Sequence, residues 1–173
     1  MMIMSELMSP ATLDEQQVWE ALREVPDPEL PVVSVVSMGI VRRIQVDAAH
    51  SAIQVDITPT FAGCPALAQI RQGIHACLSK LASHVEVNVT MQQPWTSDML
   101  SAEARQKLLA VGIAPPPKIG RGRALSVLMS RPLTCPYCGS QQTTLENAFG
   151  PTPCRAIAYC AHCHQPFEQF KPI

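Results

Sequence analysis

The sequence predicts an α+β fold, in which a small sheet packed with helices in the order α-β-β-α-β-α precedes a small β module. Over residues 1–112 the apolar side chains alternate between helical spacing and a period of two, which is typical of mixed structure. Over residues 133–173 four cysteines fall into two close pairs. Residues 113–132 begin with IAPPPKIGRG, whose three prolines and two glycines indicate a linker between two domains.

The first predicted helix begins near Thr12 and ends before the prolines of PDPELP. Thr12 and Glu15 have the spacing of a capping box, in which two side chains satisfy free N–H groups of the first turn. Val18, Leu22 and Val25 then share one helix face. The three prolines of PDPELP exclude a continued helix, because they lack N–H donors and disfavour helical angles before them.

The rest of the first domain is predicted to contain three strands and two helices. Residues 40–47 and 52–60 are strand-like and joined by the hairpin loop DAAHS, and residues 85–91 alternate as a third strand. Residues 65–81 form an apolar stripe at helical spacing, and residues 101–111 form a last helix that ends at a glycine. This order predicts a sheet with helices on one face.

The cysteine pairs of the second domain indicate a metal site. CPYC and CAHC contain Cys135, Cys138, Cys160 and Cys163, with 21 residues between the pairs. Such spacing places four thiolates around one tetrahedral zinc ion and predicts a small β zinc ribbon, although iron in a rubredoxin-like site fits the same ligands. Two disulfides are disfavoured in a reducing cytosol. His162 and His164 flank the last ligand and are interpreted as surface residues rather than ligands.

Cys64 stands apart from these pairs, between Gly63 and Pro65 at the expected start of a helix. The free N–H groups and the dipole of a helix N-terminus favour a thiolate, so the sequence predicts an exposed thiol of lowered pKa. The alternative is a small buried cysteine that packs a tight turn. Cys77 lies on the apolar stripe and is predicted to pack in the core, whereas Cys154 is either a core residue or a second reactive thiol.

Charge and composition exclude several function classes. Residues 1–112 carry 7 basic and 12 acidic side chains, a net of −5, and residues 113–173 carry 6 basic and 2 acidic, a net of +4. Four thiolates on Zn²⁺ reduce that positive charge, and aromatic residues are 5% of the chain, so a nucleic-acid surface is not expected. The sequence has no signal-peptide pattern and no membrane-length apolar run, which predicts a cytoplasmic protein.

Several stretches resemble the PaaD family, small accessory proteins encoded with the phenylacetyl-CoA ring-1,2-epoxidising monooxygenase. They are DPELPVVSVVSMGIVR, TPTFAGCPA, PWTSDMLSAEARQKLLAVGIAPP and the cysteine ribbon ending PFEQFK. The resemblance covers nearly the whole chain from about residue 12 and keeps the order of the motifs. It implies an N-terminal domain of the iron–sulfur cluster assembly type, and a role in aerobic phenylacetate degradation.

The resemblance also implies which residues matter. The family's acidic-proline motif falls on Asp27, Pro28 and Glu29, and its signature thiol falls on Cys64 within its Gly63 and Pro65 frame. A charged turn that needs no chemistry is the alternative for the acidic motif.

Two positions depart from the family pattern. Ser37, Met38 and Gly39 stand where relatives usually have Asp-Leu-Gly, and Pro172 follows Phe170-Lys171 where relatives often have cysteine. Any role of those two family positions is therefore in doubt for this chain.

The implied function is maturation of a partner, without intrinsic catalysis. The expected partner is the iron–sulfur reductase or another component of the monooxygenase, and the alternative is a structural subunit of the oxygenase complex. One thiol cannot hold a cluster, which needs about four ligands, so Cys64 would need Cys154, a client or a second copy in a homodimer. A thiol oxidoreductase is disfavoured because the first domain has no CxxC, and an oxygenase subunit because no Glu-x-x-His occurs.

Overall fold

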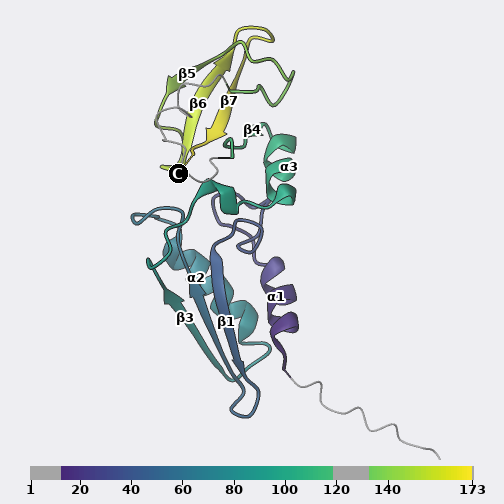
Figure 1. Cartoon of the computed structure of the whole chain (residues 1–173), viewed down its shortest axis with the longest axis vertical. Helices are drawn as coiled ribbons and strands as arrows, with labels where there is room; N and C mark the ends of the chain where they lie inside the picture. The colour runs from purple at the N-terminus through teal and green to yellow at the C-terminus, as the bar shows by residue number, and fades with distance from the viewer. Residues whose placement is uncertain (1–12, 119–132, 173) are drawn as a thin grey trace, which may run out of the picture.

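The computed structural model describes residues 13–118 and 133–172, which form two small sheets and three α-helices (Figure 1). The elements are α1 (Glu15–Arg23), β1 (Val41–Asp47), β2 (Ala52–Ile57), α2 (Leu67–Leu78), β3 (His84–Val89), the 3₁₀ helix η1 (Ser97–Met99), α3 (Ala102–Ala110), β4 (Ile113–Ala114), β5 (Thr143–Asn147), β6 (Arg155–Cys160) and β7 (Gln165–Phe170). The predicted α+β class and the predicted order of elements are confirmed. No helix in these two ranges is long and apolar enough to cross a membrane.

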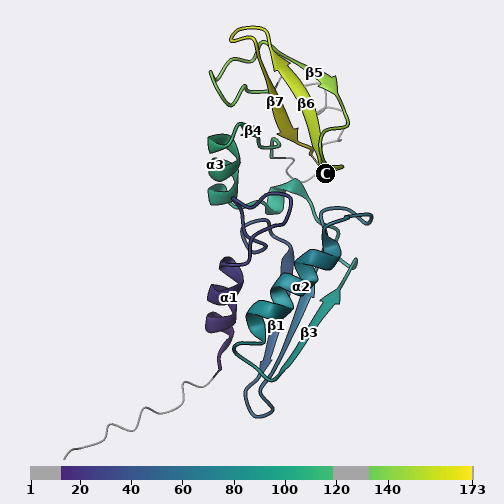
Figure 2. The same cartoon turned by 180° about the vertical axis from the view of Figure 1, so that it is seen from behind.

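The first sheet has the strand order β1-β2-β3, with an antiparallel hairpin followed by a parallel pair. In the central strand Ile53, Val55 and Ile57 are buried, as their alternation predicts, and they pack against α2 and α1. Figure 2 shows α2 lying across this face of the sheet. The loop from α1 to β1 adds further buried side chains to the core, among them Leu30 and Val33.

The helix ends differ from the sequence prediction by one to three residues. The capping box of α1 uses Asp14 and Gln17 rather than Thr12 and Glu15, and Thr12 lies outside the described residues. Asp14 is the stronger choice because its carboxylate accepts the Gln17 N–H at 2.8 Å while carrying a charge that suits a helix N-terminus. α2 ends at Leu78, so Leu81 of the expected apolar stripe is 39% exposed.

The second sheet has the order β4-β7-β6-β5 and lies beyond α3 from the first sheet (Figure 1). Ile113 and Ala114 follow α3 directly, and they pair in parallel with β7. Phe170, at the end of β7, is fully buried against Trp95, with ring centroids 5.8 Å apart. The second sheet therefore packs through Phe170 against the segment that follows β3. The predicted division at residues 1–112, 113–132 and 133–173 stays a prediction, and residues 119–132 lie outside the described residues.

Candidate functional site

Four cysteine sulfurs meet beside β6, from the turn before β5 and the turn between β6 and β7. They belong to Cys135, Cys138, Cys160 and Cys163, and all lie within 4.8 Å of one another. The Cys135–Cys163 and Cys138–Cys160 sulfur pairs are each 3.6 Å apart. Tetrahedral zinc with Zn–S bonds of about 2.3 Å requires sulfurs about 3.8 Å apart. The four side chains thus form a metal-binding cluster whose donors fit one tetrahedral ion.

The two cysteine turns have the same backbone geometry. The Gly139 N–H donates to the Cys135 carbonyl and the His164 N–H donates to the Cys160 carbonyl, each at 2.9 Å. Gly139 has φ +73° and His164 has φ +59°, so each turn ends in a left-handed residue. His164 lies with Nδ1 3.3 Å from the Tyr159 hydroxyl. Within the described ranges, neither this histidine nor His162 belongs to the group of ligand atoms.

One sulfur of the cluster is prepared for metal by the backbone. The N–H groups of Cys163 and His162, together with the thiols of Cys163 and Cys138, point to the sulfur of Cys160 and lower its pKa to about 6, whereas burial and the neighbouring sulfurs raise the pKa of Cys163. A thiolate at neutral pH is the form that binds a soft metal ion. Metal binding then removes protons from the remaining thiols.

Cys64 lies in the turn that connects β2 to α2, three residues before the helix begins. Its N–H donates to the Phe61 carbonyl at 3.1 Å, and its own carbonyl accepts the Leu67 N–H at 3.3 Å. The backbone N–H groups of Ala66 and Leu67 face its sulfur, as expected beside a helix N-terminus. The side chain is half-buried and packs against the main hydrophobic core.

The predicted exposed thiol of low pKa is wrong for Cys64. Burial raises the pKa of the thiol, and the carboxylates of Glu29 and Asp27 raise it further, whereas the Ala66 and Leu67 N–H groups oppose them. The tertiary structure brings the acidic loop to the thiol from 35 or more residues away in the sequence. The predicted direction rested on the helix alone, which is why it was the opposite of the one observed.

The two acidic residues of the motif have different roles. Asp27 is 6% exposed, and one of its carboxylate oxygens accepts the N–H groups of Glu29 and Leu30, each at 2.9 Å. Burial raises the pKa of Asp27, and these two N–H groups oppose the shift. Asp27 therefore holds the shape of the turn, whereas the half-buried Glu29 keeps its carboxylate available.

Cys154 joins this loop from the second sheet. Its sulfur lies 3.7 Å from the Glu29 Oε2 atom and 3.2 Å from the Thr152 hydroxyl. The residue is 4% exposed, and burial raises the pKa of its thiol to about 11. Both Cys64 and Cys154 therefore lie in the field of Asp27 and Glu29. The distances place Cys154 as a hydrogen-bond donor to a motif carboxylate rather than as a reactive thiolate.

The side chains of Cys77 and Ser37 make contacts that support the fold. Cys77 is half-buried against the core, and its thiol donates to the Ala21 carbonyl at 3.4 Å. Ser37 is 8% exposed, and its hydroxyl accepts the Ser34 N–H at 2.9 Å in a local turn. The serine at this position thus closes a turn that needs no charge.

The contacts that join the ribbon to the first sheet were not predicted from the sequence. The Cys154 thiol, just before β6, donates to the Glu29 carboxylate at 3.7 Å, and the Phe170 ring packs on the Trp95 ring with centroids 5.8 Å apart. The buried alternation of β6 and β7 was a signal for the sheet, but no sequence pattern pairs residues so far apart.

Two family models match this chain, one over the first part and one over the cysteine ribbon. Residues 15–91 match the iron–sulfur cluster assembly protein family, and residues 125–171 match the PaaD zinc beta ribbon domain. A protein of Escherichia coli K12, named as a "Putative 1,2-phenylacetyl-CoA epoxidase" subunit, is 32% identical over 98% of this chain and 100% of its own length.

Other relatives resemble the first part alone. "Fe-S protein maturation auxiliary factor SufT" of Staphylococcus aureus is 35% identical over 52% of this chain and 99% of its own length. A crystal structure of a domain of unknown function, DUF59, from Bacillus anthracis has 31% identity and a TM-score of 0.51, and the match covers 54% of this chain and 90% of that one.

An iron–sulfur assembly domain followed by a cysteine ribbon defines the class as accessory proteins of iron–sulfur maturation type. Within that class, the full-length match identifies the chain as a member of the PaaD family, as its motifs predict.

Proposed function

We propose that this protein assists the assembly or insertion of an iron–sulfur cluster in the reductase component of a phenylacetyl-CoA epoxidase, within aerobic phenylacetate degradation. The observation that carries the proposal is that Cys64 lies in the electrostatic field of the Asp27 and Glu29 carboxylates, in the domain that matches iron–sulfur assembly proteins. The relative named as an epoxidase subunit supports the link to phenylacetyl-CoA epoxidase, and the relative named as an Fe-S maturation factor supports the role in cluster assembly. The free cysteines fit a reducing cytoplasm.

The electrostatics of Cys64 suit a cargo cation better than a nucleophilic reaction. Burial and, to a smaller extent, the neighbouring carboxylates raise its pKa, so the thiol is protonated at neutral pH and is a poor nucleophile. The same carboxylates attract a positive ion, and an ion that binds the sulfur displaces the proton. The Ala66 and Leu67 N–H groups then stabilise the resulting sulfur charge. The turn thus favours a thiolate only when the metal is present.

Cys64 supplies one ligand to the cargo, and the others come from a partner. Clusters are held by about four ligands, and the described residues form no second group of metal ligands beside the ribbon cluster. Cys154 is committed to Glu29 and Thr152, so the client or a second copy of the chain completes the coordination. A single ligand on the carrier suits transfer, because few bonds must break when the cargo leaves.

The ribbon cluster is proposed to hold one structural zinc ion through its four cysteines. All four donors come from the protein and no position is left for water, which is the pattern of structural sites. The ion orders the turns that support β6 and β7, and these strands carry Cys154 and Phe170 to the first sheet.

Co-expression of the monooxygenase components with and without this chain tests the function. Iron and acid-labile sulfide in the purified reductase are expected to fall several-fold without it, with the reductase polypeptide still produced. Equal cluster content in both preparations would remove the proposal.

A structural subunit of the oxygenase complex is the second candidate, because the full-length relative is named as an epoxidase subunit. Gel filtration separates the two. A stable stoichiometric complex favours the subunit, and a transient complex that depends on the cluster favours the maturation factor.

A further inference from the structure

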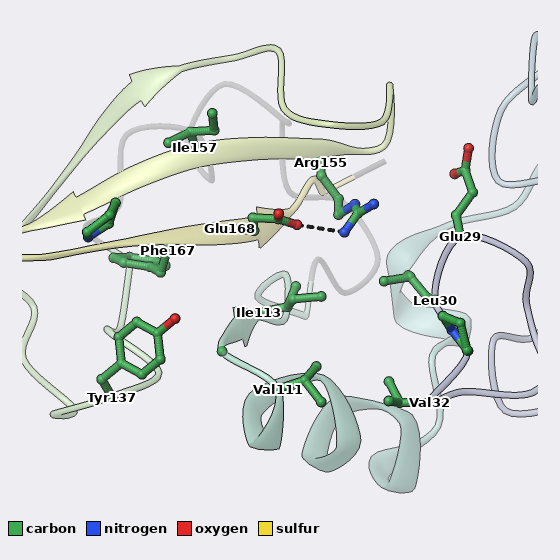
Figure 3. Close-up of a pocket in the computed structure, with 13 residues that line it drawn as sticks. Glu29, Leu30, Val32, Val111, Ile113, Tyr137, Arg155, Ile157, Phe167 and Glu168 are labelled. Atoms are coloured by element: carbon green, nitrogen blue, oxygen red, sulfur yellow. Dashed lines mark hydrogen bonds and ion pairs between the residues drawn. The ribbon is translucent and has the colours of Figure 1, made fainter.

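A groove of about 570 Å³ lies between the loop after α1, the end of α3 and the ribbon (Figure 3). Leu30 and Val32 line it from the loop, Val111 and Ile113 from the end of α3 and from β4, and Tyr137 and Phe167 from the ribbon. Figure 3 shows Leu30, Val111 and Ile113 directed into one apolar space below the Arg155–Glu168 pair.

The walls of this groove are unusually exposed for apolar side chains. Val32 is 37% exposed, Val111 49% and Tyr137 57%, so three of the chain's exposed large hydrophobic residues gather at one site. Contiguous apolar surface beside charged groups is typical of an interaction site. A free small molecule would remain largely in water here, whereas binding pockets bury most of their ligand. The shape suits a side chain anchored on a larger partner.

The charged residues at one end of the groove indicate which charge the partner should carry. Arg155 is occupied, because its guanidinium donates to Glu168 at 2.7 Å and to the Thr152 hydroxyl at 2.9 Å. Within the described ranges Glu29 forms no ion pair, and its carboxylate accepts a hydrogen bond from the Cys154 thiol. One carboxylate therefore remains without a cation at the edge of an apolar groove.

We propose that this groove binds a large apolar side chain of a partner protein that carries lysine or arginine within a few residues of it. The apolar side chain fills the space between Val32, Val111 and Tyr137, and the cation pairs with Glu29. This inference goes beyond the proposed maturation function, since it concerns recognition of a segment and not the cargo. The Glu29 carboxylate also contributes to the electrostatic field at Cys64, so a cation that pairs with Glu29 would change the field at this thiol.

The test is selection of a random dodecapeptide library, displayed on phage, on the full-length zinc-loaded protein. Val111→Lys removes the apolar wall, and Leu109→Lys is its matched control, because Leu109 lies on the same helix with 40% exposure and does not line the groove. Lysine is tolerated near a helix C-terminus. Tyr137→Lys repeats the test from the ribbon should Val111→Lys fail to fold.

The expected result is an enriched motif with one large apolar residue and lysine or arginine within three positions. Selected peptides should bind Leu109→Lys as well as wild type, and Val111→Lys and Tyr137→Lys at least about tenfold more weakly. Selection on Glu29→Gln should keep the apolar residue and lose the basic one. An acidic motif, no enriched motif, or equal binding by folded Val111→Lys, Tyr137→Lys and Leu109→Lys would overturn the proposal. Because no iron is measured, either result leaves the maturation function to its own test.

Discussion

The ribbon cluster and the Cys64 turn place the same type of side chain in different surroundings. In the ribbon, backbone N–H groups lower the pKa of Cys160 to about 6 while burial and the neighbouring sulfurs raise that of Cys163, and the four sulfurs form a closed set of donors. At Cys64, burial and two carboxylates raise the pKa of a lone thiol, and the donor set is open. The comparison teaches that a closed site suits permanent metal, whereas an open, anionic site suits metal that arrives and leaves.

The largest expected effect comes from breaking the closed site. Cys138→Ser should reduce bound metal from about one equivalent to less than half, and it should unfold the ribbon, because structural zinc contributes on the order of 10 kcal/mol to such modules. Elemental analysis and cobalt exchange measure the metal. The helical signal in circular dichroism should largely remain, since the helices lie in the first part of the chain. Trp95 fluorescence should change because Phe170 leaves its ring.

Loss of metal together with the whole helical signal would contradict this separation of the two parts. Wild-type protein with less than half an equivalent of zinc and iron combined, and no cobalt–thiolate band, would contradict the metal site itself.

Replacing Cys64, the single donor of the open site, should abolish maturation of the client with little loss of stability. Cys64→Ser keeps nearly the same size, so the free energy of unfolding should fall by about 1 kcal/mol or less. Iron and sulfide in reductase produced beside this variant should fall several-fold. Cys77→Ser is the control. Because the serine hydroxyl can donate to the same Ala21 carbonyl, we expect a loss near 1 kcal/mol and normal client maturation.

If reductase produced beside Cys64→Ser contains as much cluster as reductase produced beside wild type, Cys64 has only a structural role in the turn. Chemical denaturation of both variants shows whether a lost function reflects the thiol or the fold.

Raising the pH tests the contact between the Cys154 thiol and the Glu29 carboxylate, because it ionises the thiol. The pKa of Cys154 is about 11 in the folded protein against 9.0 for a free thiol, so its stabilising effect is complete below about pH 9 and is lost as pH rises to 11. A pKa difference of two units corresponds to a contribution of roughly 2–3 kcal/mol to the free energy of unfolding. The pH-dependent loss of stability above pH 9 should therefore be smaller in Cys154→Ala, as measured by urea unfolding at each pH. An identical slope in both proteins would contradict the buried protonated thiol.

The smallest effect concerns the charge beside Cys64. Glu29→Gln removes one carboxylate that raises the pKa of the thiol, so more thiolate is present at pH 8 and iodoacetamide should modify Cys64 roughly twofold faster. Peptide mass spectrometry measures the rate at each cysteine. Glu24→Gln is the matched control, because Glu24 raises the pKa of Cys77 and not that of Cys64. A slower reaction in Glu29→Gln would show that the carboxylate does not act through charge.

Local patterns in the sequence were enough to predict the order of elements and the four ribbon sulfurs. The alternation of Ile53, Val55 and Ile57 follows from the period of a strand, and the CxxC spacing follows from the size of a metal ion. Both depend on neighbours within a few residues, so no long-range information is needed. The resemblance of whole motifs to the PaaD family also required only the sequence, and the full-length match confirmed it.

The tertiary structure alone decided the electrostatics of Cys64 and the groove. Cys64 was expected to have a lowered pKa from its helix, but burial of the thiol, together with Glu29 and Asp27 from another loop, raises the pKa instead. Cys154 meets Glu29 although 125 positions separate them in the chain. The pKa of a group depends on every charge and every layer of protein around it, and packing between distant segments sets both. For this protein the sequence singles out Cys64 as the candidate thiol, and only the folded chain shows which form that thiol takes.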